Sequence, residues 1–446
     1  MCTQDTELGN SRYKLLQISW YAERDNSIKF TSLAHLLDEE FLSDCYFSLN
    51  RNKAIGIDNI SWEEYGKYLD NNLENLVNRL KKKKFKPVPA KRVYIPKGNG
   101  KTRPLGISSI ENKIVERGIT EILSAIYEYD FIDESYGFRV RRNAHQALKK
   151  VSSDMMSKSI NHIVEADITG FFDNVSHDFL MGFLKNRISD SSLLFLINRF
   201  LKAGYVEDGL LITSDKGTPQ GSILSPILAN IFLHYVLDEW FENVVKTHTK
   251  GYCGLIRYAD DFVCLVSLKK DADRIEKALK SRFNKYNLEL HPEKSSNISF
   301  GRFEQENAKN QNRKANTFTF LGLTHFCDIT RRGYFKVGRK TSKKKFASKC
   351  VDMNTWLRSV RNLTKTSKWW KILDSKLRGH YQYYGVSENY KGIKRYYNIT
   401  IKLVYKWLNR QSQKKRMNWI EFSSYLKHYP LSKPRIVHNF YLSDAR

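Results

Sequence analysis

Short apolar runs alternate with polar turns through the middle of the chain, and their lengths suit strands. Leu255-Ile256 and Phe262–Val266 flank the polar stretch Arg257-Tyr258-Ala259-Asp260-Asp261. Two apolar runs so close together predict a β-hairpin with both acidic residues at its tip. A third apolar pair, Ile163-Val164, precedes Asp167 and predicts a strand that ends near this residue.

Helical and hairpin signals mark the region before these strands. The spacing of apolar residues predicts helices around Leu42–Leu49 and Tyr65–Leu80. A basic hairpin follows, in which Arg92–Ile95 would pair with Lys101–Ile107 across Gly98-Asn99-Gly100, a favourable turn sequence.

Apolar residues at three- and four-residue steps dominate the last hundred residues and predict three helices. The apolar positions are Phe346, Cys350, Met353, Leu357 and Val360 in the first, Trp370, Leu373, Leu377 and Tyr381 in the second, and Ile401, Val404 and Leu408 in the third. Before them, the stretch 303–316 is rich in Asn, Gln and Lys and is interpreted as a loop that leads into a strand at 318–321. Most aromatic side chains of the last third are expected to lie in the helical core.

Positive charge is concentrated at one end of the chain. The 446 residues carry a formal net charge of +28. Residues 301–446 hold 33 Lys and Arg against 8 Asp and Glu, so the rest of the chain is nearly balanced. Such a polycation attracts phosphate backbones through counterion release, and we therefore expect a nucleic acid partner. No apolar run approaches the roughly 20 residues that span a bilayer, which argues against a membrane protein.

Cysteine usage and the N-terminal residues bear on the compartment. The six cysteines are scattered without any C-x-x-C pair, so neither a zinc pattern nor a disulfide framework is predicted. The N-terminus lacks the apolar core of a secretion signal. Together these features predict a protein of a reducing compartment, the cytoplasm.

Three acidic residues form the candidate chemical centre. Adjacent carboxylates such as Asp260 and Asp261 repel each other unless a cation bridges them, and hard oxygen ligands are those that Mg²⁺ prefers. With Asp167 beside them, these residues could hold two metals about 3.5–4 Å apart, the arrangement that supports in-line phosphoryl transfer. For Asp260 and Asp261 taken by themselves, a solvated acidic turn is the alternative.

These residues also carry a resemblance. Tyr258-Ala259-Asp260-Asp261, together with Asp167 and Phe171-Phe172-Asp173, resembles the reverse transcriptases encoded by group II introns. Supporting motifs follow in the family's order: Ile95-Pro96-Lys97, Arg103–Ile107, Ser135–Arg139, Gly217–Ser222, Leu224-Ser225-Pro226, Phe320-Leu321-Gly322, Leu377–Tyr381 and Pro430–Ile436. The resemblance runs from roughly residue 40 to the C-terminus. It implies that the three acids are catalytic and bind two Mg²⁺ ions, with Mn²⁺ as a substitute.

The resemblance implies an α+β protein with the right-hand polymerase fold. Residues 41–110 would form the fingers, and residues 111–325 the palm, an antiparallel sheet with helices that includes part of the fingers. Residues 326–446 would form a helical, strongly basic thumb and maturase region. Residues 1–40, with a short helical pattern at 33–37, would be a leader or extension.

Further residues receive roles from the resemblance. Lys97 and Arg103 would clamp the triphosphate of the incoming nucleotide through charge-assisted contacts. Phe172 would exclude a ribose 2′-hydroxyl, so that dNTPs are the substrates. Gln220 would contact the nucleotide or the template base, and Lys294 would donate a proton to pyrophosphate.

The implied function is RNA-directed DNA synthesis from a DNA primer on an RNA template. As a maturase the protein would also bind group II intron RNA and promote its splicing and its mobility into target DNA, as part of a ribonucleoprotein or at the bacterial nucleoid. Two alternatives stay open: a stand-alone enzyme with a host role in repair or phage defence, and a splicing-only RNA-binding protein. The C-terminal endonuclease of many relatives is not found, which puts cutting of the second DNA strand in doubt. The oligomeric state stays open, a dimer included.

Overall fold

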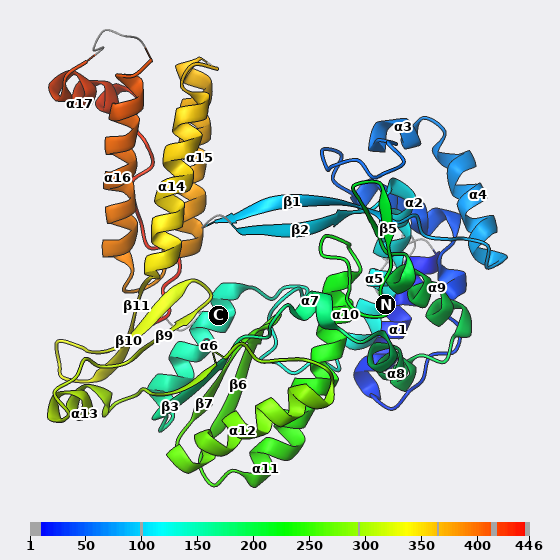
Figure 1. Ribbon diagram of the computed structural model, residues 1–446, viewed down its shortest axis with the longest axis horizontal. Coiled ribbons are helices and arrows are strands. Elements are labelled where there is room, and N and C mark those ends of the chain that lie inside the picture. Colours follow the sequence, from blue (N-terminus) through cyan, green and yellow to red (C-terminus); the bar gives the residue numbers. More distant parts are fainter. Residues whose placement is uncertain (1–9, 99–100, 293–294, 364, 412–416, 442–446) are drawn as a thin grey trace, which may run out of the picture.

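The computed structural model of the protein describes residues 10–98, 101–292, 295–363, 365–411 and 417–441 (Figure 1). Helices from the first part of the chain gather on one side, and a helical bundle from the last third stands upright on the other. A sheet flanked by helices lies below and between them. The expected α+β fold with antiparallel sheets is confirmed.

The helices of the first part pack around α5 (Ile110–Tyr127), whose apolar side chains are buried along its whole length. Around it lie α1 (Asn10–Arg24), η1 (Ala34–Leu36), α2 (Glu39–Ser48), α3 (Trp62–Gly66) and α4 (Leu69–Lys81). The single helix expected over 65–80 is wrong, because the helix breaks after Gly66. A Cβ at this position would overlap the Tyr46 hydroxyl, so the close packing requires glycine here.

A four-stranded sheet, which we call the palm sheet, occupies the centre. Its strands are β3 (His162–Ala166), β6 (Cys253–Tyr258), β7 (Asp261–Val266) and β8 (Ser296–Ser299), in the order β6-β7-β3-β8 with antiparallel neighbours. Alternate residues face opposite helices: Ile163 and Val263 pack toward α6 (Ala144–Ser157), whereas Val164 and Cys264 pack toward α12 (Lys269–Lys285). Burial on both faces explains the continuous apolar run Phe262–Val266 in β7.

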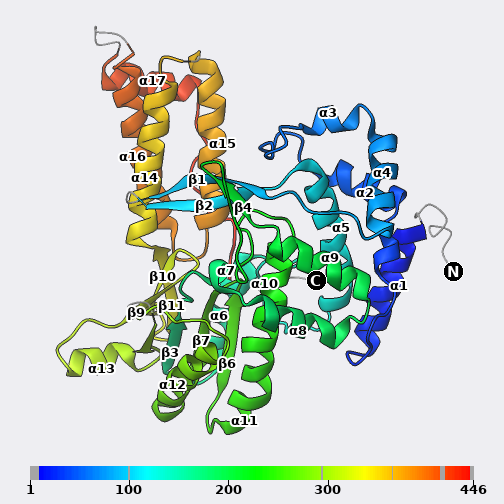
Figure 2. The same ribbon diagram turned by 45° about the vertical axis from the view of Figure 1, so that its right-hand side comes forward.

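The expected basic hairpin is confirmed as β1 (Ala90–Gly98) and β2 (Lys101–Ile107), which pair antiparallel. It joins β4 (Tyr205–Glu207) and β5 (Leu210–Ile212) in a second sheet, ordered β2-β1-β4-β5. In both views the hairpin extends from the first helices toward the upright bundle (Figures 1 and 2). Along the chain, the helices between β3 and β6 are α7 (Phe171–Asn174), α8 (His177–Arg187), α9 (Ser191–Lys202), α10 (Ser225–Leu233), the π-helical turns η2 (His234–Asp238) and η3 (Phe241–Val245), and α11 (Lys246–His248).

Three strands precede the long helices of the last third. β9 (Thr317–Phe320), β10 (Leu323–Ile329) and β11 (Phe335–Thr341) form a sheet, so the helical region begins at residue 343 and not at 326 as expected. The three predicted helices are confirmed and form what we call the thumb bundle: α14 (Lys343–Val360), α15 (Thr366–Tyr384) and α16 (Tyr390–Leu408). α17 (Trp419–His428) follows them. Among the described residues, no helix has both the length and the apolar character needed to cross a membrane.

The loop expected over 303–316 is wrong in part, because it contains the helix α13 (Glu304–Asn310). The Glu304 carboxylate is buried, forms an ion pair with Arg313 and accepts a hydrogen bond from the Asn316 amide at 2.8 Å. These contacts tie the start of α13 to the residues that follow the helix. In addition, an acidic residue in the first turn stabilises a helix through the helix dipole. The composition of the segment carries no sign of either effect.

Candidate active site

The three candidate acids lie at one end of the palm sheet. Asp167 directly follows β3, and Asp260 lies in the turn between β6 and β7, where Tyr258 pairs with Asp261. β3 and β7 run antiparallel with Ala166 opposite Phe262. The next residues along this register are Asp167 and Asp261, so the sheet itself brings the strand-end acid opposite the hairpin acid.

All three acids line one cavity of about 860 Å³. Arg103 reaches the cavity from β2, and Phe138 from the loop after α5. Residues of the β9–β10 turn and of the thumb bundle complete the lining. These are Leu321, Gly322, Lys345, Lys349, Asp352, Met353, Trp356, Lys376, Gly379, His380, Tyr383, Tyr384 and Tyr396.

The electrostatics around Asp260 combine burial with a neighbouring carboxylate. Burial raises the pKa of Asp260, and the nearby negative charge of Asp167 raises it further. Arg103 and Arg257 act in the opposite direction and lower this pKa. A buried carboxylate beside a second carboxylate is suited to binding a cation. The positive charge offsets both the desolvation of the carboxylate and its repulsion by the neighbouring charge.

The donor set therefore fits a divalent metal in kind and in location. Among the described residues, no three His, Cys, Asp or Glu side chains are gathered closely enough to hold an ion as they stand. The terminal torsion of an aspartate side chain is broad, so the small rotations that would bring these carboxylates to a shared ion are inexpensive.

Local backbone contacts hold the acids in place. The His291 amide donates a hydrogen bond to the Asp167 carbonyl at 2.8 Å, and Ile168 bridges to Leu290. On the other side, the Tyr136 amide donates to the Arg257 carbonyl at 2.9 Å. Gly137 then lies directly against the turn, and a Cβ there would overlap the Ala259 amide nitrogen.

Of the other residues with expected roles, some line the cavity and others do not. Arg103 lines the cavity, whereas Phe172 and Gln220 do not belong to its lining. Phe172 is half-buried against the Phe171 ring at 5.4 Å, and the Gln220 amide donates to the Asp173 carboxylate at 3.3 and 3.4 Å. Lys97 belongs to strand β1, but its side chain lies outside the described residues, as does the whole of Lys294.

The thumb side of the cavity was missed by sequence reasoning. Lys345 and Lys349 lie one turn apart on α14 and both line the cavity, and the His380 ring stacks on the Tyr396 ring at 3.7 Å. The Tyr383 hydroxyl donates to the Leu321 carbonyl at 3.0 Å, which ties the thumb bundle to the β9–β10 turn. The spacing of four between the two lysines was the available signal.

Comparison with known proteins gives a consistent set of similarities. Residues 95–325 match the profile of the family described as reverse transcriptase (RNA-dependent DNA polymerase). The chain is 32% identical to protein YkfC of Escherichia coli (strain K12) over 285 residues, which cover 56% of this chain and 74% of YkfC.

Two further relatives have names that refer to introns. The group II intron-encoded protein LtrA of Lactococcus lactis subsp. cremoris is 37% identical over 222 residues, covering 49% of this chain and 37% of LtrA. Nuclear intron maturase 3, mitochondrial, of Arabidopsis thaliana is 23% identical over 226 residues, covering 44% of this chain and 31% of that protein. The match thus spans well under half the length of both intron proteins.

Proposed function

Because the chain belongs to the reverse transcriptase family of RNA-dependent DNA polymerases, we propose that it extends a DNA primer along an RNA template at the cavity lined by Asp167, Asp260 and Asp261. The observation that carries this proposal is the register of β3 and β7, which brings acids from distant parts of the chain to one cavity. The strongly basic last third of the chain would attract the phosphates of a primer–template bound beside this cavity.

The three carboxylates would hold two divalent cations, Mg²⁺ with Mn²⁺ as a substitute. Bound there, the ions would lower the pKa of the primer 3′-hydroxyl and stabilise charge on the pyrophosphate leaving group. Arg103 would bind the triphosphate through charge-assisted hydrogen bonds. Gly322, with a φ of 77°, would let the primer end approach the backbone closely. Lys97, Phe172, Gln220 and Lys294 keep their proposed roles around the nucleotide.

Primer extension on an RNA template with Mg²⁺ and dNTPs tests the proposal. The wild-type chain should extend the primer, and Asp260→Ala should lower the rate by at least about a hundredfold to a thousandfold, because charge stabilisation in the transition state is lost. Asp178→Ala is the matched control: this aspartate is exposed in the first turn of α8 and does not line the cavity. Equal activity of Asp260→Ala and wild type would contradict the metal assignment.

A maturase activity is the second part of the proposal. It is supported by the similarity to LtrA and to a nuclear intron maturase, and by the 33 Lys and Arg of residues 301–446. The protein would bind group II intron RNA and stabilise the folded form that splices. Mobility into target DNA would follow from the same complex.

Splicing of the transcript that surrounds this coding sequence, at a low Mg²⁺ concentration, separates the alternatives. Faster splicing with the protein, and with Asp260→Ala as well, would support a maturase that acts independently of polymerisation. No effect on splicing together with full primer extension would support the stand-alone enzyme with a host role. Splicing without extension by the wild-type chain would support the splicing-only protein.

A further inference from the structure

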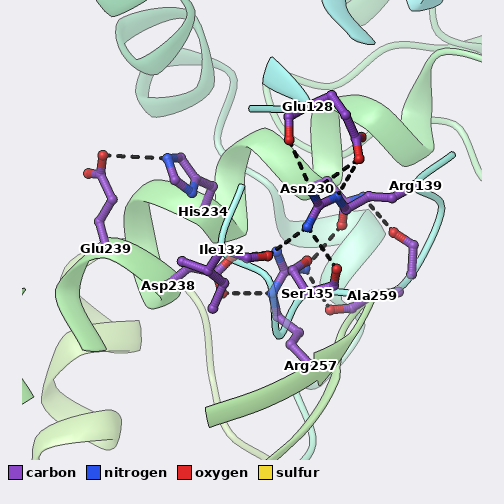
Figure 3. A network of polar contacts seen from close by, with 11 residues as sticks. Glu128, Ile132, Ser135, Arg139, Asn230, His234, Asp238, Glu239, Arg257 and Ala259 are labelled. Carbon is purple, nitrogen blue, oxygen red and sulfur yellow. Dashed lines mark hydrogen bonds and ion pairs between the residues drawn. The ribbon is translucent and has the colours of Figure 1, made fainter. Parts of the chain in front are cut away.

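A buried ion pair between Arg257 and Asp238 lies beside Ala259, the residue that precedes Asp260 and Asp261 (Figure 3). Arg257 of β6 and Asp238 at the end of η2 are both fully buried. The guanidinium donates two parallel hydrogen bonds to the carboxylate, one of them from Nε to Oδ1 at 2.8 Å. Bidentate pairs of this kind fix orientation as well as charge.

This pair is poorly explained as a source of stability. Desolvation of two buried charges offsets most of their attraction, and apolar residues of similar volume often serve stability equally well. Its contacts indicate another role. The remaining guanidinium nitrogen, Nη1, donates to the Ala259 carbonyl at 3.0 Å and to the Asn230 Oδ1 at 3.0 Å.

The Ala259 carbonyl belongs to a strained residue. Ala259 has a φ of 57°, in the left-handed region that costs a non-glycine residue roughly 1–2 kcal/mol. Such a conformation persists only where the surroundings determine it. The hydrogen bond from Arg257 and the contact with Gly137 are the surroundings that the structure shows.

Asn230 extends the network to the second loop of the cavity. Its side-chain amide donates to the Gly137 carbonyl at 2.7 Å, and Gly137 precedes Phe138, which lines the cavity. One buried network therefore holds both the acidic turn and the Phe138 loop. Arg139 holds the same loop from its other end, through the Ile132 and Ser135 carbonyls at 2.6 and 2.9 Å (Figure 3).

The π-helical turn η2 brings the Asn230 and Asp238 side chains to the same side of the helix, where both contact Arg257. Eight residues of regular α-helix turn through about 800°, which would leave these two side chains about 80° apart. Residues 234–238 form a wider π turn, which reduces this offset. Both side chains consequently reach the Arg257 guanidinium. Short π segments in helices are frequent at functional sites.

We propose that Asn230, Asp238 and Arg257 form a positioning network whose role is to set the affinity of the neighbouring acidic turn for divalent cations. The network touches neither substrate nor ions; it acts through the Ala259 and Gly137 carbonyls and through the charge of Arg257 near Asp260. This inference rests on the proposed metal-dependent function. It explains why an Arg precedes the Tyr-Ala-Asp-Asp turn.

Binding of Mn²⁺ to the full chain, followed by electron paramagnetic resonance, tests the inference without relying on activity. Asp238→Asn removes the carboxylate charge and leaves the buried Arg257 charge unpaired, and Asn230→Ala removes the link between the two loops. Both should weaken Mn²⁺ binding at least about tenfold. They should raise the Mg²⁺ concentration for half-maximal primer extension by a similar factor, and leave the affinity for the primer–template within about twofold.

Glu304→Gln is the matched control. Glu304 is also a buried carboxylate in an ion pair, but it lies in α13 and does not line the cavity. Glu304→Gln should lower the melting temperature and leave Mn²⁺ binding unchanged. If Asp238→Asn does not fold, Asn230→Ala carries the comparison.

Three outcomes would be distinct. Unchanged Mn²⁺ binding in a folded network variant would overturn the inference, as would an equal weakening in Glu304→Gln. A wild-type chain that binds Mn²⁺ but never extends a primer would overturn the proposed function, and weaker Mn²⁺ binding by the network variants would still support the positioning network.

Discussion

At the scale of single residues, the cavity holds side chains whose placement favours cation binding over stability. Asp260 is the clearest case, because burial and the charge of Asp167 both raise its pKa. A carboxyl group with a folded-state pKa above its unfolded value binds protons more tightly when folded. Its ionisation therefore destabilises the fold as the pH rises through these values.

Asp260→Asn should consequently separate stability from activity. In metal-free buffer at pH 7–8 the variant should melt at the same temperature as wild type or up to about 2–4 °C higher. The difference should vanish as the pH falls below the ordinary range for carboxyl groups, where the wild-type side chain is neutral too. Thermal melts across pH, in the presence of a chelator, measure both effects; a variant that melts well below wild type at pH 7–8 would contradict the electrostatic account.

Phe172 carries a prediction about the choice of sugar. If its ring excludes the 2′-hydroxyl, Phe172→Ala should raise incorporation of rNTPs relative to dNTPs by about tenfold to a hundredfold. The ratio of kcat/KM for the two nucleotides measures the effect. Phe195→Ala, at an exposed phenylalanine of α9, should leave the ratio unchanged. An unchanged ratio for Phe172→Ala would show that this half-buried ring serves packing alone.

At the scale of elements, local patterns predicted the pieces of the site, but not the assembly around them. The hairpin that carries Asp260 and the strand before Asp167 are confirmed, since both follow from neighbouring apolar runs. The register between β3 and β7 is a contact between distant segments, which no local pattern contains. Asn230 and Asp238 were not predicted either, because their partner Arg257 is distant in sequence and the π turn that aligns them leaves no signal in residue spacing.

Gly137 links two of these elements and provides a test of their fit. Because a Cβ at this position would overlap the Ala259 backbone, Gly137→Ala should displace the acidic turn and lower primer extension at least about tenfold. Gly182→Ala is the control: no atom lies within 4 Å of its would-be Cβ in α8, so it should stabilise the protein by about 0.5–1 kcal/mol with full activity. Rates and melting temperatures of both variants check the prediction, and full activity of Gly137→Ala would contradict the close packing.

At the scale of the whole molecule, chemistry and charge are divided between two parts of the chain. The acids lie at the end of the palm sheet, whereas most of the net positive charge belongs to residues 301–446. The thumb bundle brings Lys345, Lys349 and Lys376 to the same cavity as the acids. This arrangement would let the duplex bind through its phosphates while its primer end reaches the carboxylates.

The salt dependence of primer–template binding measures how many phosphates the thumb-bundle lysines contact. Replacing Lys345, Lys349 and Lys376 by Gln should reduce the slope of log K against log salt concentration by about 3, if each contacts one phosphate of the duplex. The same change at Lys269, Lys270 and Lys277, which are exposed on α12, should leave the slope unchanged. Equal slopes for the two triple variants would contradict a specific role for the thumb side of the cavity.

The central claim is that acids from β3 and from the β6–β7 turn share divalent cations. Anomalous scattering from Mn²⁺, in crystals of the protein with a primer–template and a non-hydrolysable dNTP analogue, tests this claim most directly. We predict manganese peaks coordinated jointly by Asp167 and by Asp260 or Asp261, about 3.5–4 Å apart. Manganese bound elsewhere, or by the hairpin acids without Asp167, would contradict it.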